Sequence, residues 1–246
     1  MKVKLLTYTP EPEKVVAAAA KLCYSKSEAT ELFDGLDPEK CQKFVEMLAD
    51  MGHQSPLEHA SFTFAIEGVS RTFLAQVTRH RIASYSVQSQ RYVKKEGFEY
   101  IVPPAIAADE TAADEYQKAM EAAEQAYEKI SAILYEKYVA ETGAVTPKDK
   151  SACEKRAIED ARFVLPNACD TQMIMTMNAR SLLNFFSLRC CNRAQWEIRA
   201  VADEMLRLVR EIAPHIFVKA GPGCVRGACP EGKMSCGKPR TELKVD

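Results

Sequence analysis

The stretch "RHRIASYSVQSQRY", residues 79–92, gathers positive charge and hydroxyl groups in one short part of the chain. It holds three arginines, a histidine, three serines and two tyrosines, and no aspartate or glutamate. One interpretation is that acids from elsewhere in the fold pair with these arginines, which is the common fate of a single arginine. The other is that an anionic ligand compensates the charge. A guanidinium offers phosphate a forked charged contact, and a hydroxyl adds a neutral donor.

The charge of the whole chain limits this interpretation. The 246 residues include 33 Lys and Arg against 34 Asp and Glu, a formal charge of −1. A broad nucleic-acid footprint is therefore not expected. No apolar run approaches the roughly 20 residues that span a bilayer, and the first residues do not resemble a signal peptide. We expect no membrane association and a cytoplasmic location.

The chain has nine cysteines, an odd number that forms no recognisable disulfide framework. This fits a reducing compartment. Cys224, Cys229 and Cys236 are spaced C-x4-C-x6-C, which is not the spacing of a paired C-x2-C zinc site. The spacing of His53 and His59, six residues apart on a predicted loop, does not define a coordination geometry for a metal ion. We therefore predict no metal site.

Hydrophobic periodicity predicts the elements around the basic stretch. Strands are expected at 3–9, 60–69 and 169–177, and helices at 10–25, 37–52, 70–81, 109–142, 148–165, 178–189 and 194–212. The helix 70–81 would carry the basic residues at its end, with Gln76, Arg79 and His80 directed at one ligand. If 86–92 is extended, Ser89 and Arg91 share a face.

A second polar cluster lies in "NARSLLNFFSLR", residues 178–189. Asn178 and Arg189 are eleven positions apart and return to nearly one face of a helix whose other residues are mostly apolar. Polar groups on a buried helix need partners. A helix-capping Asn and a surface Arg explain the same residues equally well.

Three blocks together resemble the flavin-dependent thymidylate synthase family. "RHRIASYSVQS" fits the RHR-x7-S signature with Arg79, His80, Arg81 and Ser89 in register. The upstream "GHQSPLEHASFTF" and the downstream "NARSLLNFFSLR" with "AQWEI" are similar to further family segments in the same order. The resemblance covers most of residues 50–215. It implies a family domain at 1–220, followed by a Cys-, Gly- and Pro-containing tail at 221–246.

The resemblance implies an α/β (α+β) fold, a single domain in which long helices flank an antiparallel sheet. It also implies that the protein is an enzyme and that it forms a homotetramer whose sites are built from several subunits. The ligands would be FAD, dUMP, methylenetetrahydrofolate and NADPH, with no nucleic acid and no metal. The flavin would then contact His53, Ser55, Arg79, His80, Arg81, Val87, Asn178, Ala179, Arg180 and Asn184. The nucleotide would contact Gln76, Arg79, Val87, Ser89, Gln90, Arg91, Arg162 and Arg189.

The chain departs from the family at two positions. Many members have Asn-Glu where this chain has Ser86 and Val87, so Val87 can offer only its backbone to the ligands. Some members have a histidine where this chain has Arg193, and no role is carried over to that residue.

The implied chemistry belongs to the cofactor, so no protein nucleophile is needed. Arg189 is the expected catalytic residue, because a permanent cation beside the uracil would stabilise negative charge on its N3–O4 edge and activate carbon 5. Two alternatives stay open. One is an FAD-dependent oxidoreductase of nucleotide metabolism that transfers no carbon. The other is an RNA-binding module with Tyr85 and Tyr92 as stacking platforms.

Overall fold

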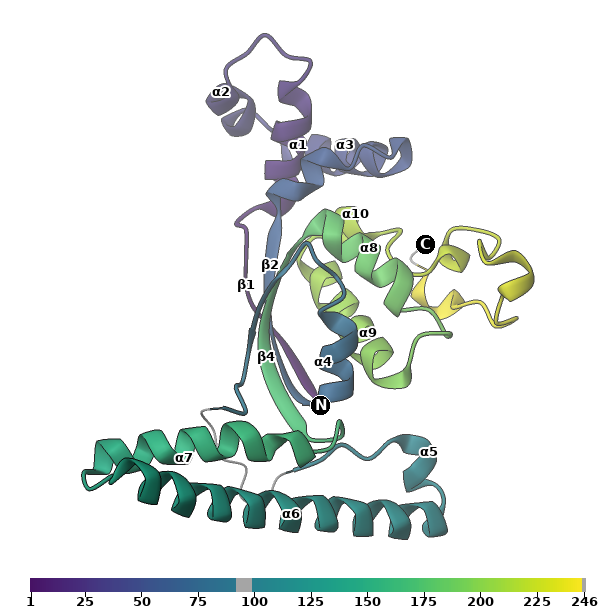
Figure 1. The fold of residues 1–246 in the computed structure, drawn as a ribbon. Coiled ribbons are helices and arrows are strands. Elements are labelled where there is room, and N and C mark those ends of the chain that lie inside the picture. Colours follow the sequence, from purple (N-terminus) through teal and green to yellow (C-terminus); the bar gives the residue numbers. More distant parts are fainter. Residues whose placement is uncertain (92–98, 245–246) are drawn as a thin grey trace. The chain divides into compact units, whose positions relative to one another are not determined.

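A computed structural model describes residues 1–91 and 99–244 of the chain. It contains one four-stranded antiparallel sheet in the order β1-β2-β4-β3, together with helices (Figure 1). The strands are β1 Lys2–Tyr8, β2 Ser61–Ser70, β3 Ser84–Val87 and β4 Asp170–Asn178. β1 runs antiparallel to β2, from Lys2 opposite Glu67 to Tyr8 opposite Phe62. The predicted mixed fold around an antiparallel sheet is confirmed.

The residues contact one another in two compact units. Unit 1 comprises Met1–Glu67, Gln76–Ser86 and Met173–Asp246, and unit 2 comprises Gly68–Ala75 and Val87–Gln172. The strands β2, β3 and β4 and the helix α4, Arg71–Val77, each contribute residues to both units. Within the described residues, no helix is both long enough and apolar enough to cross a membrane.

Unit 1 contains six α-helices within the described residues, and α3 follows the expected capping signals. The six helices are α1 Pro12–Leu22, α2 Ala29–Asp34, α3 Pro38–Met51, α8 Ala179–Arg189, α9 Trp196–Ile212 and α10 Pro214–Phe217, with a 3₁₀ helix at Ser55–His59. The carboxylate of Asp37 accepts the N–H of Glu39 at the start of α3, and Gly52 ends that helix with φ 71°. The tail adds 3₁₀ turns at Gly223–Val225, Gly232–Met234 and Thr241–Leu243.

The core of unit 1 contains a row of aromatic rings in contact, which connects the sheet to α8. Phe62 of β2 is fully buried and lies 5.5 Å from Phe217 of α10, measured between ring centroids. Phe217 lies 6.0 Å from Phe186, which in turn lies 5.9 Å from Phe185. Burying each of these rings contributes roughly 1.5–3 kcal/mol, and their edge-on contacts hold α8 in a defined position.

Unit 2 is built on a helical hairpin, α6 Glu110–Thr142 and α7 Pro147–Ala161, which lie side by side in Figure 1. A short α5, Pro104–Ala107, precedes them and a 3₁₀ turn, Arg162–Val164, follows. Asp109 caps α6 by accepting the N–H of Ala112, and Gly143 ends it with φ 62°. The long helix predicted at 109–142 is therefore confirmed.

One local prediction was wrong, and the condition set for another is not met. The helix expected at 70–81 ends at Val77, so Arg79, His80 and Arg81 lie in the turn after α4. The condition that 86–92 is extended is not met in the described residues, since the strand ends at Val87 and Ser89 Oγ accepts the Arg91 N–H at 3.1 Å; Tyr92 lies outside the described residues. Local hydrogen bonds of turn type outcompete regular structure at both places.

Candidate functional site

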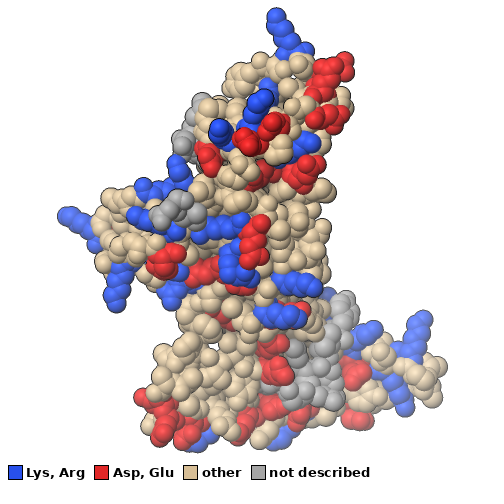
Figure 2. Space-filling model, turned by 180° about the vertical axis from the view of Figure 1, so that it is seen from behind, with Lys and Arg blue, Asp and Glu red and all other residues tan. Residues whose placement is uncertain are grey.

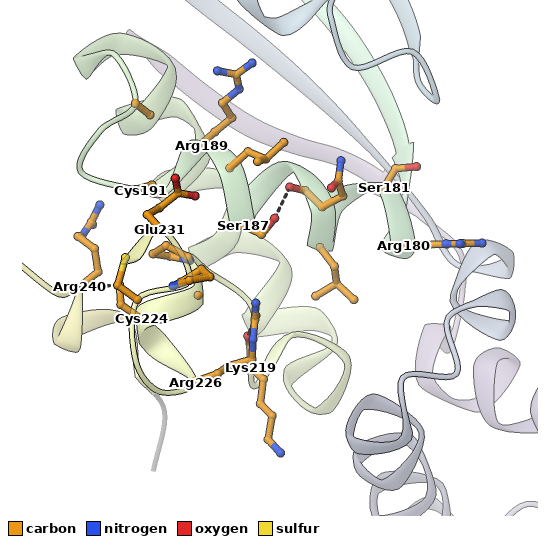
Figure 3. A pocket seen from close by; sticks show the side chains of 18 of the residues that line it. Arg180, Ser181, Ser187, Arg189, Cys191, Lys219, Cys224, Arg226, Glu231 and Arg240 are labelled. Carbon is orange, nitrogen blue, oxygen red and sulfur yellow. Dashed lines mark hydrogen bonds between the residues drawn. The ribbon is translucent and has the colours of Figure 1, made fainter. Parts of the chain in front are cut away.

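Unit 1 contains a cavity of about 1600 Å³ beside α8 (Figure 3). Its wall comes from the end of α3 and the loop after it, the turn at 79–82, α8, the α8–α9 loop and the tail. The predicted flavin residues that line it are His53, Arg79, His80, Arg81, Asn178, Arg180 and Asn184, and Arg189 lines it as well. These positions are far apart in the sequence, and the fold brings them to one cavity.

The cavity wall is strongly cationic. The lining residues include nine Lys or Arg, namely Arg79, Arg81, Arg180, Arg189, Arg193, Lys219, Arg226, Lys238 and Arg240. Among the described residues, two acids line it, Glu58 and Glu231. The molecular face drawn in Figure 2 shows basic and acidic side chains interspersed. The imbalance is therefore a property of the cavity and not of the chain, whose total charge is −1.

The turn that carries the basic residues is fixed by Tyr85 of β3. The N–H groups of Arg79 and His80 donate to the carbonyls of Gln76 and Val77, at 3.4 and 3.1 Å. The Tyr85 hydroxyl lies 2.8 Å from the carbonyl oxygens of both Val77 and His80 and shares its proton between them. Burial raises the pKa of Tyr85 to about 12, so the phenol stays a neutral donor.

His80 and Arg189 are in direct contact. The Nε of Arg189 donates to Nε2 of His80 at 3.0 Å, so Nε2 carries no proton and the imidazole is neutral in this arrangement. The His80 ring packs edge-on against Phe185, with 4.9 Å between centroids. Burial lowers the pKa of His80, and the charges of Arg189 and Arg79 lower it further. His80 is therefore held as an acceptor that orients the Arg189 side chain.

Arg79 and Arg189 have no carboxylate partner in the part of the chain that the structure describes. Within residues 1–91 and 99–244, neither forms an ion pair with an Asp or Glu. Burial lowers the pKa of Arg189, and the nearby charge of Arg79 lowers it further. Two like charges held together without an acid indicate a site that an anion completes.

The other end of α8 follows a different pattern. Arg180 is paired, since its guanidinium donates to Glu58 and, at 3.2 Å, to Gln54 Oε1. Asn178 caps α8 by accepting the Ser181 N–H at 2.9 Å, as the capping interpretation predicted, and it also lines the cavity. Ala179 is fully buried, and its N–H donates to Ala60 O at 2.7 Å.

Three of the predicted residues of unit 1 do not line the cavity. Ser55 is exposed at the start of the 3₁₀ helix, Gln76 is half-buried in α4, and Ala179 is in the core. Asn184 does line it, and its carbonyl accepts the Ser187 hydroxyl at 2.8 Å, the bond drawn in Figure 3.

Unit 2 brings together three of the predicted nucleotide residues. Arg91 forms a two-point ion pair with Glu159 of α7, with Nε and Nη2 at 2.8 and 3.0 Å from its oxygens. Arg162 donates to the carbonyl of the same Glu159 at 3.1 Å. Gln90 Oε1 accepts from Arg71 at 3.0 Å. The interpretation that an acid of the fold pairs with the arginine is therefore correct for Arg91.

Sequence reasoning missed Arg71 and the tail. Arg71 is the first residue of α4, and burial together with the nearby charge of Arg162 lowers its pKa, so Arg71 lies beside the predicted nucleotide residues Gln90 and Arg162 of unit 2. The tail forms one wall of the cavity through residues such as Cys224, Arg226 and Lys238. Its Gly- and Pro-rich sequence gave no periodic signal. Within the described residues, no group of three or more His, Cys, Asp or Glu side chains is arranged to hold a metal ion.

The RNA-binding alternative loses one of its stacking platforms. The hydroxyl of Tyr85 is bonded to two backbone carbonyls and its ring is half-buried, so it does not present a free face. Tyr92, the other proposed platform, lies outside the described residues. Within the basic stretch, Arg79, His80, Arg81 and Ile82 line the cavity of unit 1, whereas Arg91 pairs with Glu159 in unit 2.

A cavity whose described lining residues include nine cations and two acids is typical of a protein that binds anionic ligands. Comparison with known proteins makes the class specific. The family described as "Thymidylate synthase complementing protein" matches residues 4–215. A flavin-dependent thymidylate synthase of Clostridium tetani is 57% identical over 245 residues, 100% of this chain and 96% of that protein. Its counterpart in Geobacter sulfurreducens is 50% identical, over 97% of this chain and 94% of that protein.

The chain belongs to the flavin-dependent thymidylate synthase family. A third relative of the same name, from Nitratidesulfovibrio vulgaris, is 46% identical over 96% of this chain and 94% of its own length. The predicted family is thus confirmed, and with it the expected class of enzyme and of cofactor, a flavin.

Proposed function

We propose that this chain catalyses the reductive methylation of dUMP to dTMP, with methylenetetrahydrofolate as carbon donor and NADPH as reductant. One dUMP, one methylenetetrahydrofolate, one NADPH and a proton would give dTMP, tetrahydrofolate and NADP⁺. The chain is a member of the family, and the observation that carries the proposal is the cavity of its unit 1. There, Arg79 and Arg189 have no carboxylate partner among the described residues.

The donor set of the cavity fits FAD. Its volume of about 1600 Å³ exceeds the roughly 300–1,000 Å³ of common ligand pockets, which suits a dinucleotide together with further substrates. Arg79 and Arg81 offer charged donors to a pyrophosphate, and Asn178 and Asn184 offer amides. When bound, the flavin would carry the one-carbon unit and would donate the hydride. The family resemblance also assigns flavin contacts to His53, His80 and Arg180, which line the cavity, and to Ser55, Ala179 and the backbone of Val87, which do not.

The family resemblance assigns nucleotide contacts to residues of each unit. In unit 2 they are Ser89, Gln90, Arg91, Arg162 and the backbone of Val87, and in unit 1 they are Gln76, Arg79 and Arg189. Arg91 is now neutralised by Glu159, an ion pair that is half exposed and therefore weak, on the order of 0–1 kcal/mol. A doubly charged phosphate can compete with such a partner.

Arg189 would act on the uracil. Its Nε is engaged by His80, which leaves the two terminal nitrogens of the guanidinium to donate to a ligand. A cation fixed beside the N3–O4 edge stabilises charge that develops there and so activates carbon 5. His80 would act through Arg189 and is a positioning residue.

Assembly is part of the proposal. The family resemblance implies a homotetramer with sites built by several subunits, and the proposed ligand contacts fall on separate units of the chain. All nine cysteines lie in the described residues as free thiols, which supports a reducing, cytoplasmic location.

The decisive experiment measures dTMP formed from dUMP, methylenetetrahydrofolate and NADPH by the purified, flavin-loaded protein. Oxidation of NADPH that requires dUMP but yields no dTMP would favour an oxidoreductase without carbon transfer. A mixture of two inactive variants, Arg79→Ala and Arg189→Ala, tests assembly. Activity regained on mixing would support sites shared between chains, whereas no recovery would favour sites within one chain.

A further inference from the structure

The tail is anchored to unit 1 by a network of hydrogen bonds. The guanidinium of Arg240 donates to the Cys190 carbonyl at 2.7 Å and to Asp203 at 3.0 Å, and only 11% of its side chain is exposed. Arg210 of α9 donates to the carbonyls of Ala220 and Leu243, each at 2.9 Å. Asn192 donates to the Lys238 carbonyl at 2.9 Å. The tail is therefore held as a fixed wall of the cavity, and Cys190, which follows Arg189, is one of its attachment points.

This wall presents cations that the contacts proposed for FAD and dUMP do not use. Arg193 donates to the carbonyl of Met234, and Arg226 to those of Lys219, at 2.8 Å, and Gly221, at 3.5 Å. Lys238 is exposed and lines the cavity. In the part of the chain that the structure describes, none of Arg193, Arg226 and Lys238 forms an ion pair with a carboxylate.

Backbone carbonyls orient a guanidinium but do not neutralise its charge. Glu231 is the one acid of the tail that lines the cavity, and among the described residues it forms no ion pair with these cations. Figure 3 shows Arg226 and Lys219 together below α8, away from Arg180 and Ser181 at the start of that helix. The tail region of the cavity thus has its own positive charge.

We propose that the tail forms a second anion-binding subsite, which holds the multiply charged end of a second substrate through Arg193, Arg226 and Lys238. This inference rests on the proposed function. Two substrates of that reaction carry such a group: the glutamyl carboxylates of the folate and the 2′-phosphate of NADPH. Both are flexible anionic ends that a set of exposed cations attracts without a single fixed geometry.

The test compares Arg226→Gln and Lys238→Gln with Lys233→Gln, a matched control in the same tail. Lys233 is exposed and does not line the cavity. Lys238→Gln keeps the backbone carbonyl that Asn192 binds, so the tail stays anchored even if Arg226→Gln loosens it. Binding of pteroylmonoglutamate and pteroylpentaglutamate to the flavin-loaded protein is measured by calorimetry, and KM is measured for NADPH and NADH.

If the folate is the source of the anion, the wild-type protein binds the pentaglutamate at least about tenfold more tightly than the monoglutamate. Both Gln variants then lose most of that preference, and Lys233→Gln keeps it. If NADPH is the source, the preference for NADPH over NADH falls instead. The proposal is overturned if neither ratio changes in the two variants, or if Lys233→Gln changes them equally. The calorimetry does not require turnover, so absence of dTMP would refute the proposed reaction without deciding this subsite.

Discussion

Arg79 and Arg91 come from the same stretch of sequence, yet their environments in the two units differ. In unit 1, Arg79 lies near Arg189, and neither has a carboxylate partner among the described residues. In unit 2, Arg91 is neutralised by two contacts with Glu159. A cation without a partner stores an unfavourable interaction that a ligand relieves, whereas a paired cation must exchange one partner for another. Substitutions should therefore have larger effects in the cavity of unit 1.

The largest effect is expected at Arg189. Arg189→Ala should lower single-turnover dTMP formation at saturating dUMP by two or more orders of magnitude, since one lost electrostatic donor costs about 3 kcal/mol in the transition state. The flavin spectrum should not change, because the aromatic core holds α8 independently of this side chain.

Arg207→Ala is the matched control for Arg189→Ala. Arg207 is an exposed arginine of α9 whose charge is balanced by Glu204 and Glu211, and it does not line the cavity. Its loss should leave dTMP formation unchanged. A wild-type rate in Arg189→Ala at saturating dUMP would show that this arginine only anchors the nucleotide.

A smaller effect is expected at Arg91. Arg91→Ala should weaken dUMP binding about tenfold, as expected for a charged hydrogen bond of roughly 1.5 kcal/mol, with little change in the single-turnover rate at saturation. Glu159→Gln sharpens the comparison because it removes the competing partner, so dUMP binding should be retained or tightened. Equal weakening by both substitutions in a dUMP titration would mean that the ion pair is structural and Arg91 makes no phosphate contact.

Tyr85 tests whether the turn itself matters. Tyr85→Phe keeps the ring but removes the donor shared by Val77 and His80, a loss of about 1 kcal/mol. Flavin affinity and dTMP formation should each fall roughly fivefold, since 1 kcal/mol corresponds to that factor. Tyr100→Phe in unit 2 provides an aromatic control outside this turn. Unchanged flavin binding in Tyr85→Phe would show that the turn is held by other contacts.

The sequence predicted most of the elements because their signals are local. Helix α3 begins after Asp37 and ends at Gly52, and α6 begins after Asp109 and ends at Gly143, as the capping preferences of these residues indicate. The end of α4 was not predictable, because the Tyr85 hydroxyl, eight residues on, takes the carbonyl of Val77. The same limit applies to Arg91, since Glu159 is 68 positions away and no local pattern links the two.

The candidate site was predicted from the family resemblance rather than from periodicity. The RHR block and the block at 178–189 indicated the residues, and the structure shows that His80 and Arg189 touch, 109 positions apart. The tail was not predicted as a wall of the cavity. Arg240 reaches Asp203 and the Cys190 carbonyl, and a Gly- and Pro-rich segment carries no pattern that reports such long-range anchoring.

The smallest expected effect is the pH dependence that His80 contributes. Its pKa in the folded protein lies below its ordinary value of 6.5, first because of burial and then because of Arg189 and Arg79. Between those two values the unfolded chain binds more protons than the folded one, so the free energy of unfolding decreases as the pH falls below about 6.5. The decrease stops once the pH is below the folded pKa. In the folded protein Nε2 is protonated only as the pH falls through the lowered pKa of His80. It then can no longer accept from Arg189, so dTMP formation should fall around that lower pH.

Two variants separate the causes of this shift. Arg189→Ala removes one neighbouring charge and should raise the pKa of His80 toward its ordinary value, while burial against Phe185 keeps it lower than 6.5. His80→Gln retains an acceptor that does not titrate, and it should remove the pH dependence that His80 adds. NMR titration of the imidazole and urea unfolding at several pH values provide the measurements. A His80 pKa above 6.5 in the wild-type protein would contradict the neutral imidazole, and with it the orientation of Arg189 by a hydrogen-bond acceptor.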